Sequence, residues 1–356
     1  MEKQKRICIV TMGNIYLVPY LQTYLNKIEG PTTIVYWDRD NLNENDGENI
    51  FYRFQHRLDS KFDKVLGYYR YRKFVKNILL NNNFDIVILA QTLSALIVND
   101  ILLKKYKNRF IVDVRDYSYE NNKIIYHVEN KLLSNSAMNV VSSEGFLNFL
   151  PKNAEYEVAH NIRKWPEKDL YSISNRDKKR DKLNIAFIGY ISYQEQHKKL
   201  LLALKNDARF NISFIGTKSQ DLLPFCRENN IKNVTLIDTF KTEKTLDFYK
   251  NVDLVNNLYG NHTPVLDYAL SNKLYYAATL NIPILVCEET FMEDISHKYN
   301  FGITVDLDNT EKLGDYLFDS YQNIDWNQLD IGTSDFIEHV ENQQNQFEVK
   351  LFKLLN

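Results

Sequence analysis

The sequence predicts an α/β protein made of two Rossmann-like domains. Short apolar runs rich in β-branched residues alternate with segments of helical period, which is typical of a parallel sheet covered by helices. The chain has 356 residues, which is long for one domain and comfortable for two. A charged stretch at 166–182 interrupts the alternation. We therefore expect a first domain at 1–165, this linker, and a second domain at 183–333.

The overall charge favours no polyanionic partner. The formal net charge is −2 at pH 7 and the sequence pI is near 6.4, so we expect no nucleic acid. Three cysteines stand far apart without metal-ligand spacing, as in a reduced cytosolic protein. The apolar run at 7–10 is too short for a signal peptide, and the segment 86–98 falls short of the roughly 20 residues that span a bilayer. We expect a cytoplasmic protein without a metal or a membrane-spanning segment.

The first domain opens with a strand, a glycine turn and a helix. Residues 6–11 are an apolar strand, and Gly13 and Asn14 turn the chain into an amphipathic helix at 16–27. The turn lacks the Gly-x-Gly-x-x-Gly fingerprint, so we expect no nicotinamide or flavin cofactor. Gly13 and Asn14 are candidate ligand contacts, although they can equally serve only to turn the backbone. Further strands are expected at 32–37, 84–90, 109–114 and 138–142.

Basic and aromatic residues are interleaved between positions 51 and 76. Arg70 and Lys73 are examples of the basic residues, and Phe62 and Tyr69 of the aromatic ones. Such a mixture at helical spacing can lie on a membrane surface or hold a phosphorylated lipid carrier. The alternative is a pair of ordinary amphipathic helices with a solvated basic face. The functional prediction is a peripheral membrane contact through 51–76.

Two carboxylates follow the strand at 109–114. Asp113 ends this strand and Asp116 lies in the loop behind it, where the carboxyl ends of parallel strands carry ligands. A carboxylate there can act as general base toward a hydroxyl group or orient it. The alternative is that Arg115 pairs with one of the acids and only holds the loop. Asp116 and Asp113 are therefore candidate catalytic residues.

The second domain repeats the strand and helix alternation. Its key segment is a helix that begins after Ser271, a residue suited to an N-cap, and carries Lys273 in the first turn. The unpaired N–H groups and the dipole of such a helix end favour an anion. With the charge of Lys273 the site suits a diphosphate. The strands are expected at 183–189, 211–216, 234–240, 252–257, 282–286 and 301–305.

The second domain contains the segment Asn272-Lys273-Leu274-Tyr275-Tyr276-Ala277-Ala278, followed by Ile284-Leu285-Val286. This pattern resembles the donor-site segment of GT-B glycosyltransferases. The strand Phe301-Gly302-Ile303-Thr304-Val305 is similar to the strand that follows it in that family. The resemblance implies a GT-B fold, in which two Rossmann-like domains face a cleft. It also implies that the last segment, 334–356, is a helix that crosses back to the N-terminal domain. Bacterial capsule and exopolysaccharide enzymes of the family-4 type are the nearest in pattern.

The resemblance also implies roles for individual residues. The second domain would bind the nucleotide-sugar donor and the first domain the acceptor, with Gly13 and Asn14 on the acceptor side. Asp113 and Asp116 resemble the family's Asp-x-x-Asp segment, and His262 is a candidate contact to the sugar or its phosphates. The family often has Arg where this chain has Tyr190, so Lys198 or Lys199, with His197 beside them, would supply the charge. The implied donor-binding residues are Gly189, Tyr190, Lys198, Gly216, Asp238, Thr239, Ser271, Asn272, Lys273, Leu274 and Tyr276.

One departure from the family concerns catalysis. Retaining enzymes of the family-4 type commonly place two Glu residues eight positions apart, and Tyr268 and Tyr276 stand there in this chain. A phenol cannot replace the two acceptor oxygens of a carboxylate, and Asp267 is one residue out of register. Three functions therefore stay open: an active transferase, a non-catalytic binding or chaperone subunit of a transferase complex, and a nucleotide-sugar epimerase of the same fold.

The interpretation that unites these features is a glycosyltransferase. It would move a sugar from a nucleotide-sugar donor to a saccharide, lipid-linked or protein-linked acceptor in the synthesis of a surface glycan or glycoconjugate. No cofactor or metal is expected, because the helix end and the lysine can neutralise the diphosphate. We expect the protein in the cytoplasm, with a peripheral position at the inner face of the cell membrane if residues 51–76 bind lipid.

Overall fold

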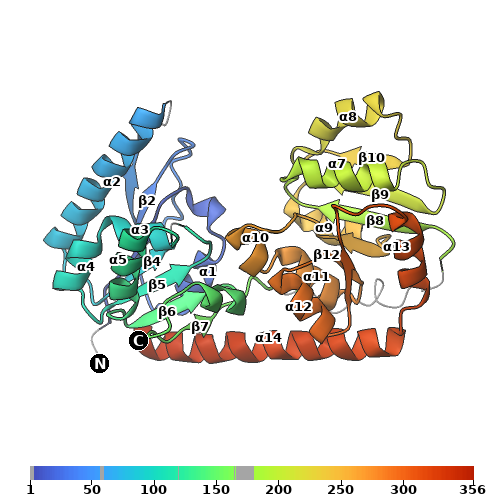
Figure 1. Cartoon of the computed structure of the whole chain (residues 1–356). Helices are drawn as coiled ribbons and strands as arrows, with labels where there is room; N and C mark the ends of the chain where they lie inside the picture. The colour runs from blue at the N-terminus through green and yellow to red at the C-terminus, as the bar shows by residue number, and fades with distance from the viewer. Residues whose placement is uncertain (1–3, 57–59, 119, 164, 166–179) are drawn as a thin grey trace. The chain divides into compact units, whose positions relative to one another are not determined.

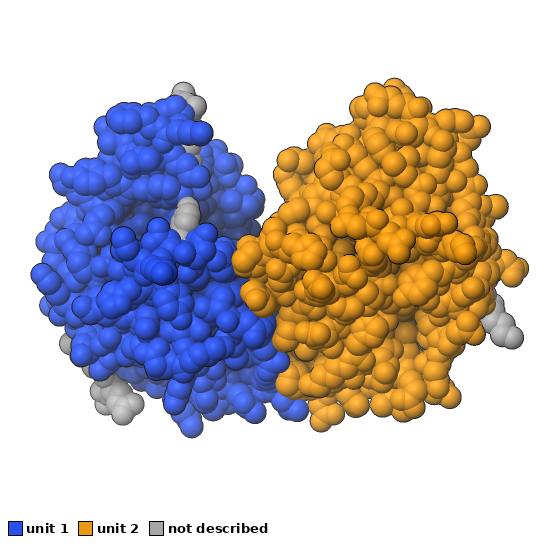
Figure 2. Space-filling model, viewed as in Figure 1, with its two compact units in different colours: residues 1–160, 342–356 blue, residues 161–341 orange. Residues whose placement is uncertain are grey.

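The structure is a computed structural model, and it divides into two compact units. Unit 1 contains residues 1–160 and 342–356, and unit 2 contains residues 161–341 (Figure 2). Most of the expected linker, 166–179, lies outside the described residues. The described residues are 4–56, 60–118, 120–163, 165 and 180–356 (Figure 1).

The described part of unit 1 contains a parallel sheet of seven strands in the order β3-β2-β1-β4-β5-β6-β7. The order reverses direction between β1 and β4, which is the switch point of a doubly wound sheet, where ligands bind at the carboxyl ends of the strands. Its strands are β1 (Ile7–Thr11), β2 (Thr33–Trp37), β3 (Ile50–Phe54), β4 (Ile86–Ala90), β5 (Phe110–Val114), β6 (Met138–Val141) and β7 (Glu157–Val158).

The edge strand β3 corrects the expectation for residues 51–76. Residues 51–54 are not helical, because the β-branched and aromatic run Ile50–Phe54 pairs in parallel with β2. Only the later part of this region is a helix, α2. The helices of unit 1 are η1 (Ile15–Leu17), α1 (Leu21–Leu25), α2 (Lys61–Asn81), α3 (Thr92–Ile97), α4 (Asn99–Lys105), α5 (Lys123–Leu133) and η2 (Glu144–Asn148), where η marks a 3₁₀ helix.

The described part of unit 2 contains a six-stranded parallel sheet in the order β10-β9-β8-β11-β12-β13. Leu183, Ile185 and Phe187 of β8 enter one apolar cluster, while Ala186 and Ile188 enter another. The sheet is therefore buried on both faces, as in doubly wound α/β folds. Its strands are β8 (Leu183–Ile188), β9 (Phe210–Ile215), β10 (Val234–Ile237), β11 (Leu254–Asn256), β12 (Ile284–Cys287) and β13 (Gly302–Val305).

The helices of unit 2 follow its strands. Two of them, α7 and α11, come directly after loops that will form the candidate site. The helices are α7 (Gln194–Ala203), η3 (Ser219–Leu222), α8 (Leu223–Glu228), η4 (Thr242–Lys244), α9 (Thr245–Tyr249), α10 (Pro264–Tyr268), α11 (Asn272–Thr279), α12 (Phe291–Lys298), α13 (Leu313–Gln322) and α14 (Trp326–Leu355).

The last helix, α14, belongs to both units. It begins at Trp326, earlier than the expected position 334, and runs to Leu355 as one helix of 30 residues. Its first part buries Phe336 and Val340 in a core of unit 2. Its last part buries Phe347 and Leu351 against β1 residues in the core of unit 1. The expected return of the C-terminal helix to the first domain is confirmed.

No helix among the described residues combines the length and the apolar character that crossing a bilayer requires. Within the same residues, no group of three or more His, Cys, Asp or Glu side chains is placed to bind a metal ion.

Candidate functional site

Two glycines bring the loops after β8 and β9 together. Gly189 and Gly216 have φ values of +134° and +135°, which glycine adopts without strain. A Cβ atom at Gly216 would lie 2.0 Å from the carbonyl oxygen of Gly189. Ile191 N–H donates a hydrogen bond of 3.0 Å to the carbonyl of Thr217. The carboxyl ends of these neighbouring strands therefore form one continuous backbone ledge.

The helix α11 begins near this ledge. Ser271 has the extended backbone of an N-cap residue, but its side chain makes no capping hydrogen bond. The Oγ of Ser271 instead donates to Oδ1 of the buried Asn257 at 2.6 Å. The prediction that Ser271 caps the helix is wrong, because its hydroxyl is engaged in this hydrogen bond to Asn257. Since no side chain caps the first turn, its N–H groups are suited to an anion.

Lys273 places a buried amine beside the ledge. Its side chain is only 5% exposed, and its Nζ would lie 3.7 Å from a Cβ at Gly189. Nζ donates to the hydroxyl of Tyr259 at 2.6 Å and lies 3.8 Å from the centroid of the Phe187 ring. Among the described residues it has no carboxylate partner, and burial lowers its pKa to about 7. The site therefore lacks the negative charge that would stabilise the ammonium form.

His197 and Lys198 do not supply the expected second cation. The imidazole of His197 is fully buried against the rings of Phe187 and Phe214. Burial, and then the charge of Lys273, lower its pKa to about 3. Lys198 pairs with Glu195 of the same helix at 2.7 Å. Both are therefore structural or surface groups in this arrangement.

Lys218, which the sequence interpretation missed, lies beside Tyr190 instead. Tyr190 follows Gly189 and is 54% exposed. The Nζ of Lys218 lies 4.9 Å from the centroid of its ring. Lys218 lies two residues after Gly216, and Tyr190 lies one residue after Gly189, so the position of each behind a glycine turn was the available signal. Tyr193, in the same loop as Tyr190, is also exposed.

Two further residues implied as donor-binding, Asp238 and Thr239, lie at the end of the next strand, β10. The hydroxyls of Thr217 and Thr239 are 3.0 Å apart, which joins the Gly216 turn to the end of β10. Asp238 accepts a hydrogen bond of 2.7 Å from the N–H of Thr239. Gly216, Asp238 and Thr239 thus lie on one continuous edge.

The remaining candidate residues of α11 differ in their accessibility to a ligand. Leu274 is fully buried in the core of unit 2, so only its backbone is open to a ligand, while Asn272 is exposed. Tyr276 packs against the rings of Trp165 and Tyr249. Burial raises its pKa, and the nearby Arg163 opposes this shift. Tyr276 therefore serves packing more than polar binding.

The short helix α10 and its preceding loop carry the other candidates. Oδ1 of Asp267 is buried and has no hydrogen-bond partner among the described residues, so this carboxylate oxygen retains an unused acceptor. His262 has a left-handed backbone with φ of +61°. Its Nδ1 lies 3.6 Å from the Glu289 carboxylate, and both side chains are exposed. His262 therefore lies on an open loop.

Asp113 is held by Arg115, as the alternative interpretation expected. The carboxylate is fully buried and receives hydrogen bonds from Arg115 Nε at 2.6 Å, Arg115 Nη2 at 2.9 Å and the Tyr24 hydroxyl at 2.7 Å. Burial alone would lower the pKa of the Arg115 guanidinium. The charge and the hydrogen bonds of Asp113 act in the opposite direction, and the net effect is a raised pKa. Both oxygens of Asp113 are engaged, so the structure corrects its assignment as a base.

Asp116 differs from Asp113 in its surroundings. Its side chain is exposed, and partial desolvation raises its pKa, an effect that Arg115 opposes. A carboxyl group with a raised pKa that can reach solvent is suited to proton transfer. Asp116 is therefore the candidate base that the geometry retains in unit 1.

Asn14 is a structural residue of the first turn. Its amide nitrogen donates to Asp38 at 2.8 Å and to Glu44 at 2.9 Å, and its amide oxygen accepts from the N–H of Arg39 at 2.9 Å. The side chain is fully buried, so it holds the turn and is closed to an acceptor. A Cβ at the neighbouring Gly13 would meet nothing within 4 Å. Open space at this turn keeps Gly13 as a candidate.

Comparisons with solved structures identify the fold. Sucrose-phosphate synthase from Thermosynechococcus elongatus is similar over 99% of both chains, with 12% identity and a TM-score of 0.72. The HepE protein of Anabaena in complex with UDP covers 98% of this chain and 99% of its own, with 10% identity and a TM-score of 0.66. WaaG, a glycosyltransferase involved in lipopolysaccharide biosynthesis, covers 98% and 97%, with 10% identity and a TM-score of 0.60. No model of a known protein family and no curated protein sequence matches the chain.

These likenesses and the two sheets confirm the GT-B fold predicted from the sequence. In unit 2 the structure joins Gly189, Tyr190, Lys273 and Gly216 around one ledge, with Thr239 at its edge. It leaves Lys198 and His262 without a contact to this ledge among the interactions of the described residues. The narrower assignment to capsule enzymes of the family-4 type remains a prediction.

Proposed function

We propose that the chain is a glycosyltransferase that uses a nucleoside-diphosphate sugar. The observation that carries this proposal is Lys273, a buried amine without a carboxylate partner among the described residues, at the uncapped start of α11 and next to Gly189. A diphosphate supplies the charge that this amine lacks. The GT-B fold and the names of its structural neighbours support this choice.

The chemistry follows from charge development during transfer. When the bond between the sugar and the diphosphate breaks, negative charge grows on the leaving phosphate. The N–H groups of α11 and the ammonium group of Lys273 then stabilise the transition state more than the bound donor. We assign Asp116 as the base that accepts the proton of the acceptor hydroxyl, because its carboxylate is exposed and desolvation raises its pKa. Lys218 takes the place of the Arg that the family often has at position 190.

The acceptor and the compartment belong to the same proposal. We assign acceptor binding to unit 1 and expect a saccharide, lipid-linked or protein-linked acceptor of surface glycan synthesis. The cysteines Cys8, Cys226 and Cys287 are buried and unpaired, which favours a reducing compartment such as the cytoplasm.

The test is turnover by the purified chain. Candidate nucleotide sugars are first ranked by thermal shift, because a ligand that binds the native state raises the melting temperature. Release of nucleoside diphosphate from the best donor is then measured with and without mixed glycan acceptors. Acceptor-dependent release that Asp116→Asn abolishes supports a transferase. Conversion of the donor without an acceptor would identify an epimerase instead.

A second candidate is a non-catalytic subunit of a transferase complex. The packing of Tyr276 against Trp165 and Tyr249 favours it, because a partly buried aromatic residue stands at one of the two positions where the family commonly has Glu. Such a subunit would still bind the donor. Donor binding without any release of diphosphate, and release that appears only when a partner transferase is added, would identify it.

A further inference from the structure

The outer face of α2 is apolar without packing against the rest of the chain. Four large apolar side chains of this helix are exposed: Phe62 at 74%, Val65, Tyr69 and Leu80. At 100° per residue, Phe62, Tyr69 and Leu80 fall on one line along the helix. With a rise of about 1.5 Å per residue, this line is roughly 27 Å long. We call this stripe and the cations beside it the outer α2 face.

The other aromatic residues of the region explain why this face is not needed for folding. Tyr71 is fully buried and packs 5.3 Å from the ring of Trp37, and Phe74 packs 5.4 Å from Phe54. These residues hold α2 against the sheet of unit 1. The apolar residues on the outer α2 face stand apart from this core.

The charges of α2 are strongly one-sided. The helix contains six basic residues and one acidic residue, Asp63. Arg72 and Lys76 pair with Asp100 of α4. The other four have no carboxylate partner among the described residues, and these four are Lys61, Lys64, Arg70 and Lys73.

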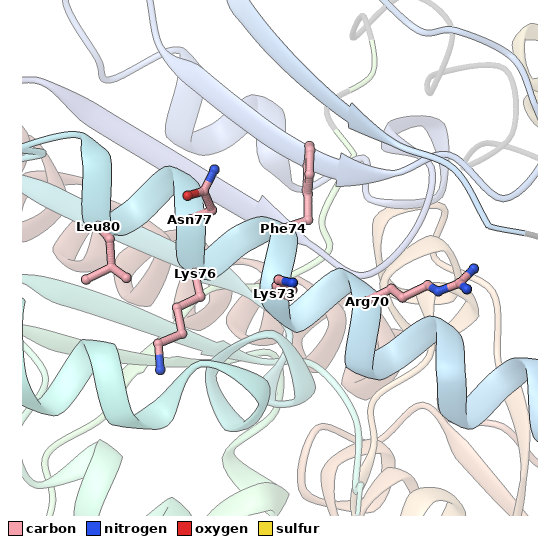
Figure 3. A pocket seen from close by; sticks show the side chains of 6 residues that line it. All are labelled: Arg70, Lys73, Phe74, Lys76, Asn77 and Leu80. Atoms are coloured by element: carbon pink, nitrogen blue, oxygen red, sulfur yellow. The ribbon is translucent and has the colours of Figure 1, made fainter.

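Two of these cations line a hollow on the helix. The hollow has a volume of about 580 Å³. Figure 3 shows its six side chains spread along α2 from Arg70 to Leu80. Its lining combines cations with apolar carbons and the amide of Asn77. This mixture matches a phosphate group attached to an acyl chain.

We propose that the outer α2 face lies on an anionic phospholipid surface. Phe62, Val65 and Tyr69 enter the boundary between headgroups and acyl chains, and Arg70 and Lys73 bind lipid phosphates. A soluble protein gains nothing from exposing an apolar stripe among cations, whereas an interfacial helix gains from both. The charge of the face, unlike the net charge of −2, is complementary to anionic lipid. This inference does not depend on the donor site.

The test is sedimentation of the full chain with phosphatidylcholine vesicles, made with and without phosphatidylglycerol. The wild type is expected to sediment only with the anionic vesicles, and less so as salt rises. Phe62→Ser combined with Lys73→Gln should weaken binding at least tenfold, since one surface cation alone contributes about fivefold.

A matched control is Phe352→Ser combined with Lys353→Gln, which removes one exposed aromatic residue and one exposed cation from α14. It should change binding less than twofold. Equal loss in both double variants would overturn the proposal, as would equal sedimentation with neutral and anionic vesicles. A dimer of the wild type that Phe62→Ser dissociates would also overturn it, because a second copy would then cover the face.

Discussion

The ammonium nitrogen of Lys273 lies 3.8 Å from the centroid of the Phe187 ring. Phe187 is in β8 and Lys273 is in α11, so this contact joins the strand that carries the Gly189 turn to the helix whose first turn is uncapped. The aromatic face stabilises a cation only in part. The remaining cost of burying the charge is what a bound diphosphate would remove.

Lys273→Met should stabilise the free protein. Burial lowers the pKa of Lys273 to about 7 from 10.5, so below pH 7 the native state holds a buried charge, and between about pH 7 and 10.5 only the unfolded state is protonated. The unfolding free energy of the wild type from this group therefore rises with pH across that window. We expect Met to add about 1–3 kcal/mol at pH 7.

The measurement is urea unfolding of both proteins at pH 7 and pH 10. The difference between them should shrink at the higher pH, because the free-energy cost of deprotonating Lys273 in the native state falls as the pH approaches 10.5, its pKa in the unfolded chain. A difference that grows with pH would contradict the proposed cost of the buried charge.

Asp113→Asn and Asp116→Asn should separate stability from activity. The first leaves the buried guanidinium of Arg115 without its counter-charge and should lower the unfolding free energy by about 3 kcal/mol. The second should leave stability within about 0.5 kcal/mol and lower kcat about 100-fold or more, if Asp116 accepts the acceptor proton. Urea unfolding and initial rates of nucleoside diphosphate release measure the two effects. An active Asp116→Asn enzyme would remove Asp116 as the base.

Gly216→Ala should destabilise unit 2. The new Cβ would lie 2.0 Å from the Gly189 carbonyl, at a φ of +135°, so we expect a loss of at least about 2 kcal/mol in unfolding free energy. Gly13→Ala is the matched control, because its Cβ would meet no atom within 4 Å. It should cost less than about 1 kcal/mol. Equal losses in the two variants would contradict the close approach of the two loops.

Lys218→Gln and Lys198→Gln compare the cation found in the structure with the one expected from the sequence. Lys218 lies beside Tyr190 on the ledge, whereas Lys198 pairs with Glu195. We expect Lys218→Gln to weaken donor binding about tenfold or more, as for one charge-assisted hydrogen bond. Lys198→Gln should leave it within about twofold. The reverse order in calorimetric affinities would restore the sequence-based assignment.

The fold was predictable because its signal is local. Alternating apolar strands and helices appear directly in the sequence, and a central parallel strand such as β8 is buried on both faces. The strand β3 was missed because its residues 51–54 precede the long basic helix with similar composition. The end of α14 in unit 1 came from the family resemblance, since no local pattern states where a helix packs.

The site was predictable only in part. Lys273 and the two glycines stand out in the sequence, because helix starts and tight turns have local signatures. The hydrogen bond of Ser271 to Asn257 and the contact of Lys218 with the Tyr190 ring both join separate loops. Such partners depend on the order of strands in the sheet. Asn14 looked like a ligand contact for the same reason, since its partners at 38–44 come from the neighbouring strand end.

The central claim is that Lys273 binds the diphosphate of the donor. It is tested most directly by calorimetric titration of the nucleoside diphosphate with the largest thermal shift into the wild type and Lys273→Met. At pH 8, in buffers of different ionisation enthalpy, the wild type should take up a proton on binding, because an anion raises the pKa of Lys273 above about 7. Lys273→Met should bind about 10–150-fold more weakly, without proton uptake. Equal affinity and equal proton uptake in the two proteins would contradict the claim.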